Sequence, residues 1–390
     1  MNIADIQLAI QAEQVDGWLF FDHHHIDPLA YRILGLPEGM HATRRWYYFI
    51  PAHGEPRGMV HRIEPHSLAA LPGEKLPYSR WAEQMDRLIT LLDGAKTVAM
   101  QWSPNCAVPY VSTVDGGTID LIRSLGVEIR SSANLVQLFE ARWSASQMES
   151  HLEAGRRMDA VRAEAFQYIR TRLRDGISLT EWDVHQYMHQ LFVASSLTTD
   201  HGPIVAVNAN ASDPHYEPTR ERHSPIESGD LVLIDMWAKL VEPADAVYYD
   251  ITWTGYCGAM PPDAMQDVFT IVSNARDCGI RTVLDRAGTG DLRGFEVDDA
   301  VRNHIQLHGF GEFFIHRTGH SIGTSVHGSG ANMDNFETHD ERHIIPRTCF
   351  SIEPGIYLPE FGIRSEVNMY VGEEGARVTG EIQRELVILG

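Results

Sequence analysis

The sequence predicts two domains, an α/β domain over residues 1–143 and an α+β domain over residues 144–390. The length of 390 residues corresponds to between two and three domains of the usual size of about 150 residues. Short apolar runs alternate with helical segments in the first part of the chain, which is the pattern of an α/β domain. The hydrophobic pattern then changes near residue 144, where a long helical periodicity begins. We therefore expect the boundary at about residue 143.

In the first domain, three short segments are rich in β-branched, aromatic and other apolar residues and are predicted to be strands. They are Gly17–Asp22, Trp46–Ile50 and Thr97–Met100. Residues Ile119–Leu125 follow with the pattern of a helix. The alternation of the two patterns predicts a sheet with helices packed against it.

The second domain is predicted to open with a long amphipathic helix. Apolar residues recur at steps of three and four from residue 144 onward, and Gly176 ends the run. The start carries capping-box spacings, either Ser144 with Gln147 or Ser146 with Glu149. Further helices are expected over 180–195 and 263–286, and strands over 231–234, 247–254, 349–352 and 367–371.

Composition and charge restrict the kinds of partner. The chain has 32 Lys and Arg against 53 Asp and Glu, a formal net charge of -21, which repels a phosphate backbone and gives no basis for nucleic-acid binding. The chain contains no run of 18 or more apolar residues, so no membrane span is predicted, and the N-terminus does not resemble a secretory signal. The four cysteines form no CxxC pair, so neither a disulfide framework nor a thiolate zinc site is indicated. We expect a cytoplasmic protein with no nucleic-acid or membrane partner.

Two aspartates lie in strand candidates of the second domain. Asp235 ends an apolar run, and Asp250 lies in a β-branched and aromatic stretch. If the two strands form a hairpin, the two carboxylates come together. Taken singly, however, either aspartate is explained as well by a turn at the end of a strand.

Three histidines, His316, His320 and His327, follow at steps of four and seven residues. Gly319 and Gly323 disfavour a helix here, so the segment is expected to be strand or loop. A helical HExxH zinc motif is excluded because no glutamate follows His316. Polar histidines in a glycine-rich loop explain this segment equally well. The separate cluster at residues 23–25 is interpreted as a solvated turn or a subunit contact rather than a metal site.

Two glutamates, Glu353 and Glu366, each lie among apolar strand residues. An isolated glutamate is rarely buried unless it is paired or bound to a metal ion. The simple partner for Glu366 is Arg364, two residues before it.

Taken together, these side chains predict a two-metal hydrolytic centre. Four carboxylates in one cluster repel each other strongly unless cations neutralise them, and two divalent ions bring the sum of charges to zero. A set rich in oxygen with a single nitrogen suits Mn²⁺, Co²⁺, Fe²⁺ or Zn²⁺, of which we expect Mn²⁺. The predicted ligands are Asp235, Asp250, His320, Glu353 and Glu366.

The order and surroundings of these residues resemble the pita-bread metallopeptidases, a family that includes aminopeptidase P, proline dipeptidase, methionine aminopeptidase and creatinase. The family's ligands run Asp, Asp, His, Glu, Glu in chain order, as the predicted ligands do here. Pro214-His215-Tyr216 resembles a histidine-bearing strand of the family, and Glu353-Pro-Gly-Ile-Tyr357 resembles its EPG-x-Y signature. The resemblance covers roughly residues 144–390, and the first 140 or so residues resemble the extra domain of the aminopeptidase P, prolidase and creatinase branch.

The resemblance implies an Xaa-Pro dipeptidase or aminopeptidase that acts on short peptides with proline in second position through a hydroxide bridging two metal ions. Glu353 would accept the proton of this nucleophile, and His215, His316 and His327 would bind the substrate carbonyl and oxyanion and help protonate the leaving nitrogen. The resemblance also implies a homodimer, for which residues 41–46 offer an aromatic and basic contact segment.

The sequence departs from the family pattern around the ligands. The loop Ala238–Ala246 between the two aspartates is enlarged, and Met236 and Trp237 follow Asp235 where a glycine is usual. Gly328 follows His327 and Val367 follows Glu366, where acidic residues are common in the family. These changes keep open a relative with a small non-peptide substrate, similar to a dimethylsulfoniopropionate lyase or an amidinohydrolase. The complete ligand set disfavours a third alternative, a metal-free binding module.

Overall fold

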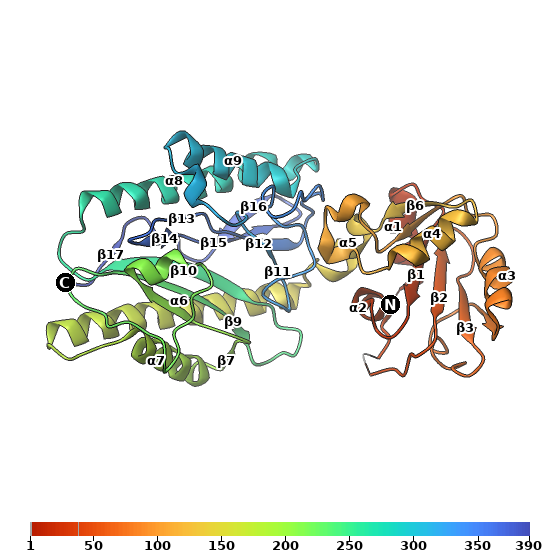
Figure 1. Ribbon diagram of the computed structural model, residues 1–390, viewed down its shortest axis with the longest axis horizontal. Coiled ribbons are helices and arrows are strands. Elements are labelled where there is room, and N and C mark those ends of the chain that lie inside the picture. The colour runs from red at the N-terminus through yellow and green to blue at the C-terminus, as the bar shows by residue number, and fades with distance from the viewer. Residues whose placement is uncertain (1, 38) are drawn as a thin grey trace. The chain divides into compact units, whose positions relative to one another are not determined.

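The computed structural model describes residues 2–37 and 39–390 (Figure 1). The chain divides into two compact units, Met1–Glu140 and Ala141–Gly390. The first unit is α/β and the second contains both antiparallel strands and helices, which confirms the predicted fold class.

The N-terminal unit is built on a six-stranded mixed sheet with the order β4-β3-β2-β1-β5-β6. Within this sheet β1 pairs in parallel with β5 and antiparallel with β2. The strands are β1 (Gly17–Asp22), β2 (Trp46–Pro51), β3 (Arg57–His61), β4 (Glu74–Tyr78), β5 (Thr97–Met100) and β6 (Glu128–Ser131). The three strands predicted for this unit are therefore present at β1, β2 and β5.

Helices cover both faces of this sheet. On one face, α1 (Ile3–Ala12), α2 (Pro28–Leu34) and α5 (Ala133–Glu140) pack against alternate residues of β1 and β2. On the other face, α3 (Trp81–Leu91) and α4 (Gly116–Ser124) pack against the remaining alternate residues. Strands that are buried on both faces are continuously apolar, which explains the run Gly17–Asp22. Two short 3₁₀ helices, η1 (Pro104–Cys106) and η2 (Pro109–Val111), follow β5.

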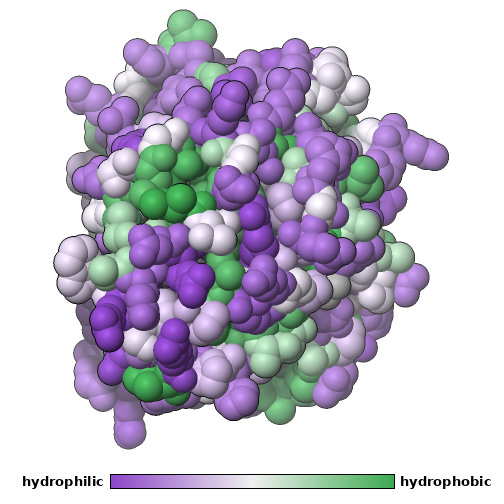
Figure 2. All heavy atoms as spheres, turned by 90° about the vertical axis from the view of Figure 1, so that its right-hand side faces the viewer, coloured by the Kyte–Doolittle hydropathy of each residue, from purple (hydrophilic) through white to green (hydrophobic). Residues whose placement is uncertain are grey.

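Residues 41–46, which were expected to form a subunit contact, are only partly exposed. Trp46 belongs to β2, is 1% exposed and packs edge-on against Tyr31 in the core, so it is wrong as a contact residue. His41, Arg44 and Arg45 are exposed. The homodimer itself stays a prediction. The face of the N-terminal unit seen in Figure 2 is mostly hydrophilic, with hydrophobic residues in separate groups.

The C-terminal unit opens with α6 (Ala145–Arg174), capped by Ser144 and Gln147 in the first of the two predicted capping boxes. This helix and α7 (Glu181–Ala194) pack against β8 (Ile204–Val207), β9 (Leu231–Leu240) and β10 (Tyr249–Tyr256). The sheet is completed by β7 (Leu197–Thr198) and β17 (Val387–Ile388).

A second helix pair covers the other strands of this unit. The helices α8 (Asp263–Arg286) and α9 (Gly294–Leu307) pack against β12 (Thr348–Ile352), β13 (Gly355–Tyr357), β14 (Gly362–Arg364) and β15 (Val367–Val371). The smaller strands are β11 (Ser321–Ile322) and β16 (Ala376–Thr379), and the 3₁₀ helices are η3 (Asn208–Ser212), η4 (Ala287–Thr289) and η5 (Gly311–Phe313). Figure 1 shows α6 and α7 on one side of the strands and α8 and α9 on the other.

Among residues 2–37 and 39–390, none of the helices combines the length and the apolar character that crossing a membrane requires.

Candidate metal centre

The β9–β10 hairpin supplies the two aspartates. In its antiparallel register Asp235 lies opposite Thr252, and Asp250 lies opposite Trp237. Residues directly opposite each other, and residues two apart along a strand, project from the same face of a sheet. Asp235, Trp237, Asp250 and Thr252 therefore share one face of the hairpin. Both carboxylates are buried, with Asp235 8% and Asp250 4% exposed.

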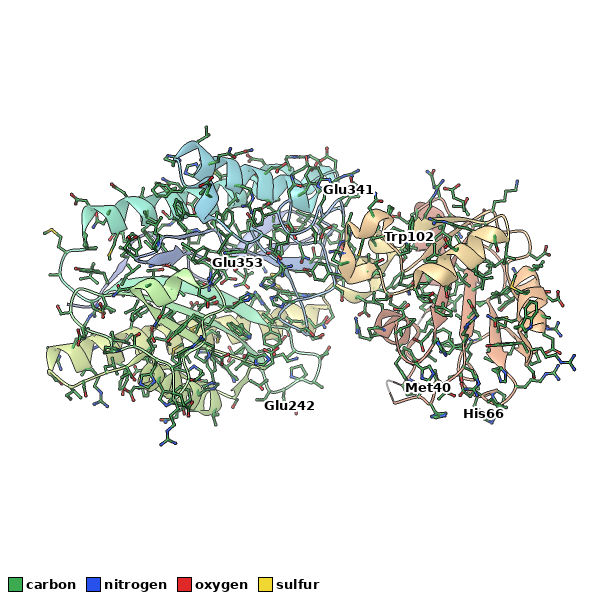
Figure 3. All side chains as sticks on the ribbon, viewed as in Figure 1. Met40, His66, Trp102, Glu242, Glu341 and Glu353 are labelled. Atoms are coloured by element: carbon green, nitrogen blue, oxygen red, sulfur yellow. The ribbon has the colours of Figure 1, made fainter. Side chains whose placement is uncertain are left out.

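The two glutamates lie where strands are interrupted. Glu353 lies between β12 and β13, and Glu366 lies between β14 and β15. An interruption frees the side chain from the alternation of a continuous strand, so both carboxylates can turn toward the hairpin. Figure 3 shows Glu353 among the strands of the C-terminal unit.

Gly319 brings the histidine segment close to β12. A Cβ atom at this position would lie 1.9 Å from the carbonyl oxygen of Ser351, so only glycine permits the approach. The backbone N–H of Ser351 donates to the carbonyl of His320 at 2.9 Å, and the backbone N–H of His320 donates to Ser351 Oγ at 2.9 Å. The segment around His320 is not helical, as predicted.

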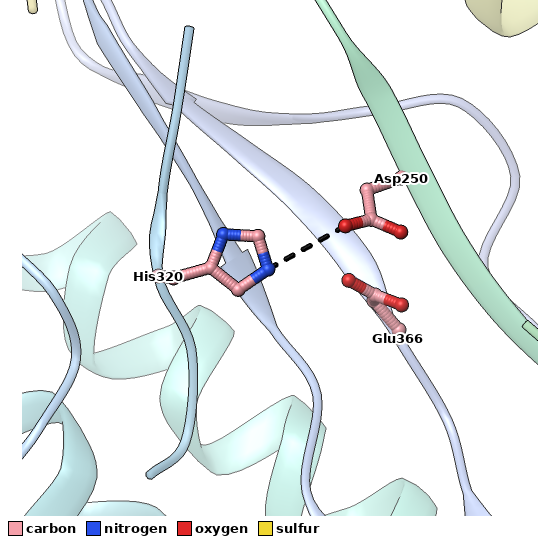
Figure 4. Close-up of side chains that lie close together, drawn as sticks. All are labelled: Asp250, His320 and Glu366. Atoms are coloured by element: carbon pink, nitrogen blue, oxygen red, sulfur yellow. Dashed lines mark ion pairs between the residues drawn. The ribbon is translucent and has the colours of Figure 1, made fainter. Parts of the chain in front are cut away.

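The imidazole of His320 faces the carboxylates. Its Nε2 lies 3.5 Å from Asp250 Oδ2, the dashed line in Figure 4, and 3.4 Å from Glu353 Oε1. Asp250, His320 and Glu366 each offer a ligand atom within 4.8 Å of the others. Nδ1 lies 3.2 Å from the carbonyl oxygen of Ser321 and must carry the proton to bond it, which leaves the Nε2 lone pair toward the carboxylates.

Arg364 binds Asp235 rather than Glu366. Its Nη2 donates to Asp235 Oδ2 at 2.5 Å and its Nε donates to Thr252 Oγ1 at 3.1 Å. Thr252 Oγ1 in turn donates to Glu366 Oε2 at 2.8 Å. The expected Arg364–Glu366 pair is therefore wrong. Arg364 is the last residue of β14, whereas Glu366 lies in the interruption between β14 and β15, so the alternation of one strand does not relate the two side chains.

The cluster holds more negative charge than its protein partners neutralise. Three carboxylate oxygens, Asp235 Oδ1, Asp250 Oδ1 and Glu366 Oε1, are buried and have no hydrogen-bond partner among residues 2–37 and 39–390. Burial raises the pKa of Asp250, and the negative charge of Asp235 raises it further. Burial likewise raises the pKa of Glu366, with Asp250 adding to the effect, and of Glu353. Unpaired buried carboxylates are costly, so the oxygen-rich donor set fits divalent cations.

The other predicted histidines lie in different surroundings. His316 has both ring nitrogens engaged, Nδ1 with the carbonyl of Arg317 at 2.7 Å and Nε2 with Tyr357 Oη at 2.6 Å. Burial lowers its pKa to about 3, so the ring is neutral near pH 7. The ring of His327 stands edge-on to the ring of His320, with centroids 4.4 Å apart. His215 is exposed in the loop after η3. Their roles stay predictions.

Three supporting side chains, Ser351, Asn368 and Thr252, were missed by the sequence reasoning, and Arg364 has partners other than the expected one. Asn368 holds the backbone of Asp250 from both sides, accepting from its N–H at 3.2 Å and donating to its carbonyl at 2.7 Å. Ser351 Oγ donates to Glu353 Oε1 at 3.0 Å, and Arg364 Nη1 donates to Tyr357 Oη at 3.0 Å. Thr252 carries the only local signal, since it lies two residues after Asp250 and so shares its face.

In the C-terminal unit two helix pairs pack against strands that carry a carboxylate and imidazole cluster, an arrangement consistent with the α+β metallopeptidase domain that the resemblance implies. The sequence model of metallopeptidase family M24 matches residues 149–373, more than half of the chain. The chain belongs to metallopeptidase family M24, and the predicted pita-bread family is confirmed.

Known proteins resemble the chain over different lengths. The Xaa-Pro dipeptidase of Pyrococcus furiosus is 30% identical over 185 residues, which cover 47% of this chain and 48% of that protein. The chain spans 48% to 59% of the length of the first three curated relatives it matches.

Solved structures match nearly the whole chain. Dipeptidase PepE from Mycobacterium ulcerans matches with a TM-score of 0.68 and 22% identity, covering 99% of this chain and 96% of that one. The X-prolyl aminopeptidase from Caenorhabditis elegans, described as a cytosolic enzyme with a di-nuclear active site, matches with a TM-score of 0.62 and 18% identity. This match covers 94% of this chain and 58% of that one. The TM-scores of these two matches show that the chain shares the fold of both proteins.

Proposed function

We propose that the protein is a dinuclear-metal hydrolase that cleaves Xaa-Pro peptide bonds, as a dipeptidase or an aminopeptidase. The observation that carries the proposal is the buried cluster of carboxylates beside Nε2 of His320, in which three oxygens have no hydrogen-bond partner in the described part of the chain. The Xaa-Pro dipeptidase relative and the di-nuclear active site described for a structural neighbour support this function.

The proposed ligands are Asp235, Asp250, His320, Glu353 and Glu366, and the proposed native ions are Mn²⁺, with Co²⁺, Zn²⁺ and Fe²⁺ also suited to this donor set. When bound, such ions supply Lewis-acid activation of water and of the scissile carbonyl. Burial lowers the pKa of His320, so the ring is neutral as a metal ligand must be.

Glu353 is the residue proposed to take the proton from the attacking water. The side chain of Glu353 is 16% exposed, so solvent reaches it, whereas Glu366 is buried. Ser351 Oγ holds Glu353 Oε1 at 3.0 Å and so fixes the direction of the carboxylate. Burial raises the pKa of Glu353, which makes this carboxylate a better proton acceptor than an exposed one.

The leaving nitrogen of an Xaa-Pro bond departs as a secondary amine and needs a proton. His327 is proposed to bind the developing oxyanion, because its ring borders His320 at the centre. His215 and His316 are proposed to contact the substrate and help deliver the proton. In the structure His316 is held by Tyr357, so this role requires the ring to exchange that partner for the substrate.

The test uses the full chain, stripped of metal and then loaded with Mn²⁺. We expect about two ions per chain and metal-dependent cleavage of Gly-Pro or of a longer Xaa-Pro peptide. Gly-Ala and Gly-Ala-Ala are the matched controls without proline and should be cleaved far more slowly. A protein that binds two ions and cleaves no Xaa-Pro peptide would contradict the peptidase proposal and favour a small non-peptide substrate.

A further inference from the structure

Trp237 occupies an unexpected place beside the predicted metal ligands. It lies two residues after Asp235 on β9 and directly opposite Asp250 on β10, so its side chain leaves the same face of the hairpin as both carboxylates. Directly opposite Cβ atoms in an antiparallel pair are about 5 Å apart. The large indole therefore starts next to the carboxylate of Asp250.

The indole is fixed at two of its edges by the segment before β8. Nε1 donates to Asp200 Oδ1 at 2.9 Å, and the same oxygen accepts from the backbone N–H of His201 at 3.0 Å. The benzo edge lies on Gly202, where an added Cβ would come within 2.7 Å of Trp237 Cη2. Gly202 also has a positive φ of 70°, in the left-handed region that favours glycine. The ring cannot swing away without losing these contacts.

The next residue on this face ties the hairpin to the loop that carries His327. Lys239 Nζ donates to the carbonyl of Thr324 at 2.6 Å and lies 5.1 Å from the centre of the Tyr248 ring. The backbone N–H of Tyr248 donates to the carbonyl of Gly323 at 2.9 Å. Lys239 and Tyr248 thus connect the end of the hairpin to the loop that carries His327. Along the hairpin, Trp237 lies between this connection and the two aspartates.

We propose that Trp237 is a specificity-determining residue, a rigid wall that limits the size of the substrate group bound beside Asp250. This inference rests on the proposed function and deepens it, since it names compact Xaa residues as the preferred substrate class. An indole buries more surface than any other side chain, and one that is held at two edges excludes a bulky group instead of moving aside. Asp200 is the corresponding positioning residue, because it acts through the indole.

The first experiment compares kcat/KM for Gly-Pro and Phe-Pro in the Mn²⁺-loaded full chain. Trp237→Ala should raise the Phe-Pro to Gly-Pro ratio by about tenfold or more, the usual scale of steric discrimination in a pocket. Trp237→Phe, which keeps an aromatic packing partner, should raise it less, and Asp200→Ala should shift it in the same direction. Trp81→Ala is the matched control, because Trp81 is 82% exposed on α3 in the other unit, and it should leave the ratio unchanged.

A second readout does not depend on peptidase activity. Acetohydroxamic acid and 3-phenylpropionohydroxamic acid chelate metal ions and differ in bulk, so calorimetry on the Mn²⁺-loaded protein measures the room beside the ions. Trp237→Ala should improve the affinity for the bulky compound relative to the small one by about tenfold. If this shift occurs while no Xaa-Pro peptide is cleaved, the wall is real and the proposed function is wrong.

Unchanged ratios in both experiments would overturn the inference. Thermal melting shows whether each variant is folded. If Trp237→Ala does not fold, Trp237→Phe tests the inference, since it preserves most of the packing. Suppose that Trp237→Phe is folded and binds metal, and that both Trp237→Phe and Asp200→Ala keep the two wild-type ratios. This result would show that the indole only fills space in the fold.

Discussion

Arg364 donates from Nη2 to Oδ2 of Asp235 at 2.5 Å, across 129 positions of the chain. The pair fixes one oxygen of Asp235, whereas the other, Oδ1, is buried and has no hydrogen-bond partner among the residues that the structure describes. Arg364 also donates to Tyr357 Oη, which is bonded to His316. One guanidinium therefore connects a predicted metal ligand with a predicted catalytic histidine, and it brings a positive charge to the carboxylate cluster.

Replacing Arg364 with Lys should weaken both metal binding and turnover. A lysine keeps the charge but cannot bond Asp235, Thr252 and Tyr357 together, because it lacks the planar fork of donors. Loss of such a supporting partner typically lowers metal affinity or activity by about 10- to 100-fold. Metal titration and kcat/KM on the same preparations measure the effect.

The matched control for this change is Arg384→Lys. Arg384 is 66% exposed and donates to Asp277 at the surface, so its replacement should change neither quantity. An Arg364→Lys protein with the metal affinity and kcat/KM of the wild type would show that charge alone, without the three bonds, is sufficient.

Replacing His320 and His327 separately should give two different phenotypes. His320→Ala removes the only predicted nitrogen ligand, so metal affinity should fall by about tenfold or more together with activity. His327→Ala removes a predicted oxyanion donor, so the metal should stay bound while turnover falls by about 100- to 1000-fold. The measurement is metal content by mass spectrometry and the rate of Xaa-Pro cleavage on the same samples. Loss of metal from His327→Ala with retention in His320→Ala would reverse the assigned roles.

Glu181 should stabilise the fold through the loop that carries His215. This fully buried carboxylate on α7 accepts hydrogen bonds from the backbone N–H groups of Val207 and Ser224, from Asn210 Nδ2 and from Tyr216 Oη. Glu181→Gln replaces one acceptor oxygen with a donor that faces other donors, so the free energy of unfolding should fall by about 1 to 3 kcal/mol. Urea unfolding at pH 7 measures the change.

Glu164→Gln is the control for Glu181→Gln. Glu164 also accepts from a tyrosine hydroxyl, that of Tyr187 at 2.8 Å, but at an exposed site where water replaces the lost bond. Its free energy of unfolding should stay within about 0.5 kcal/mol of the wild type. Equal, small losses in the two variants would mean that the network around Glu181 contributes little.

The elements that the sequence predicted well have strong local signals. The runs at residues 18–21 in β1 and 98–100 in β5 are apolar because both faces of these strands are buried, and α6 begins at a capping box that is visible in the sequence. The helix α9 was not predicted. Its buried apolar side chains Val297, Val301 and Ile305 form a single row at steps of four, and its first residue is Gly294, so the local pattern is weak.

The residue types of the site were predictable, but their contacts were not. Asp250, His320 and Glu366 come together as the sequence predicted, since few other functions explain buried carboxylates in apolar strands. The choice of Asp235 over Glu366 as partner of Arg364 depends on how β14 is placed against the hairpin, which packing between distant segments decides. The contact of Trp237 with Gly202 depends on tertiary packing in the same way.

His151 on α6 should make the stability of the fold depend on pH. Its ring is fully buried, with Nδ1 2.7 Å from the carbonyl of Tyr248 and Nε2 2.7 Å from Thr379 Oγ1. Burial lowers its pKa to about 4, whereas the imidazole of an unfolded chain has a pKa of about 6.5. Between these two values the unfolded state binds more protons than the folded state, so the free energy of unfolding falls as the pH falls from about 6.5 to about 4.

The contribution of His151 across this window is about 3 kcal/mol at most, since one pKa unit corresponds to about 1.4 kcal/mol. His151→Gln cannot titrate and should be less stable than the wild type at pH 7, with a smaller loss of stability between pH 6.5 and pH 4. Urea unfolding at several pH values measures both slopes, and His53→Gln, at an exposed histidine, should keep the slope of the wild type. If wild type and His151→Gln lose stability in parallel as the pH falls, then His151 is not kept neutral by the fold, and other buried groups must account for the pH dependence.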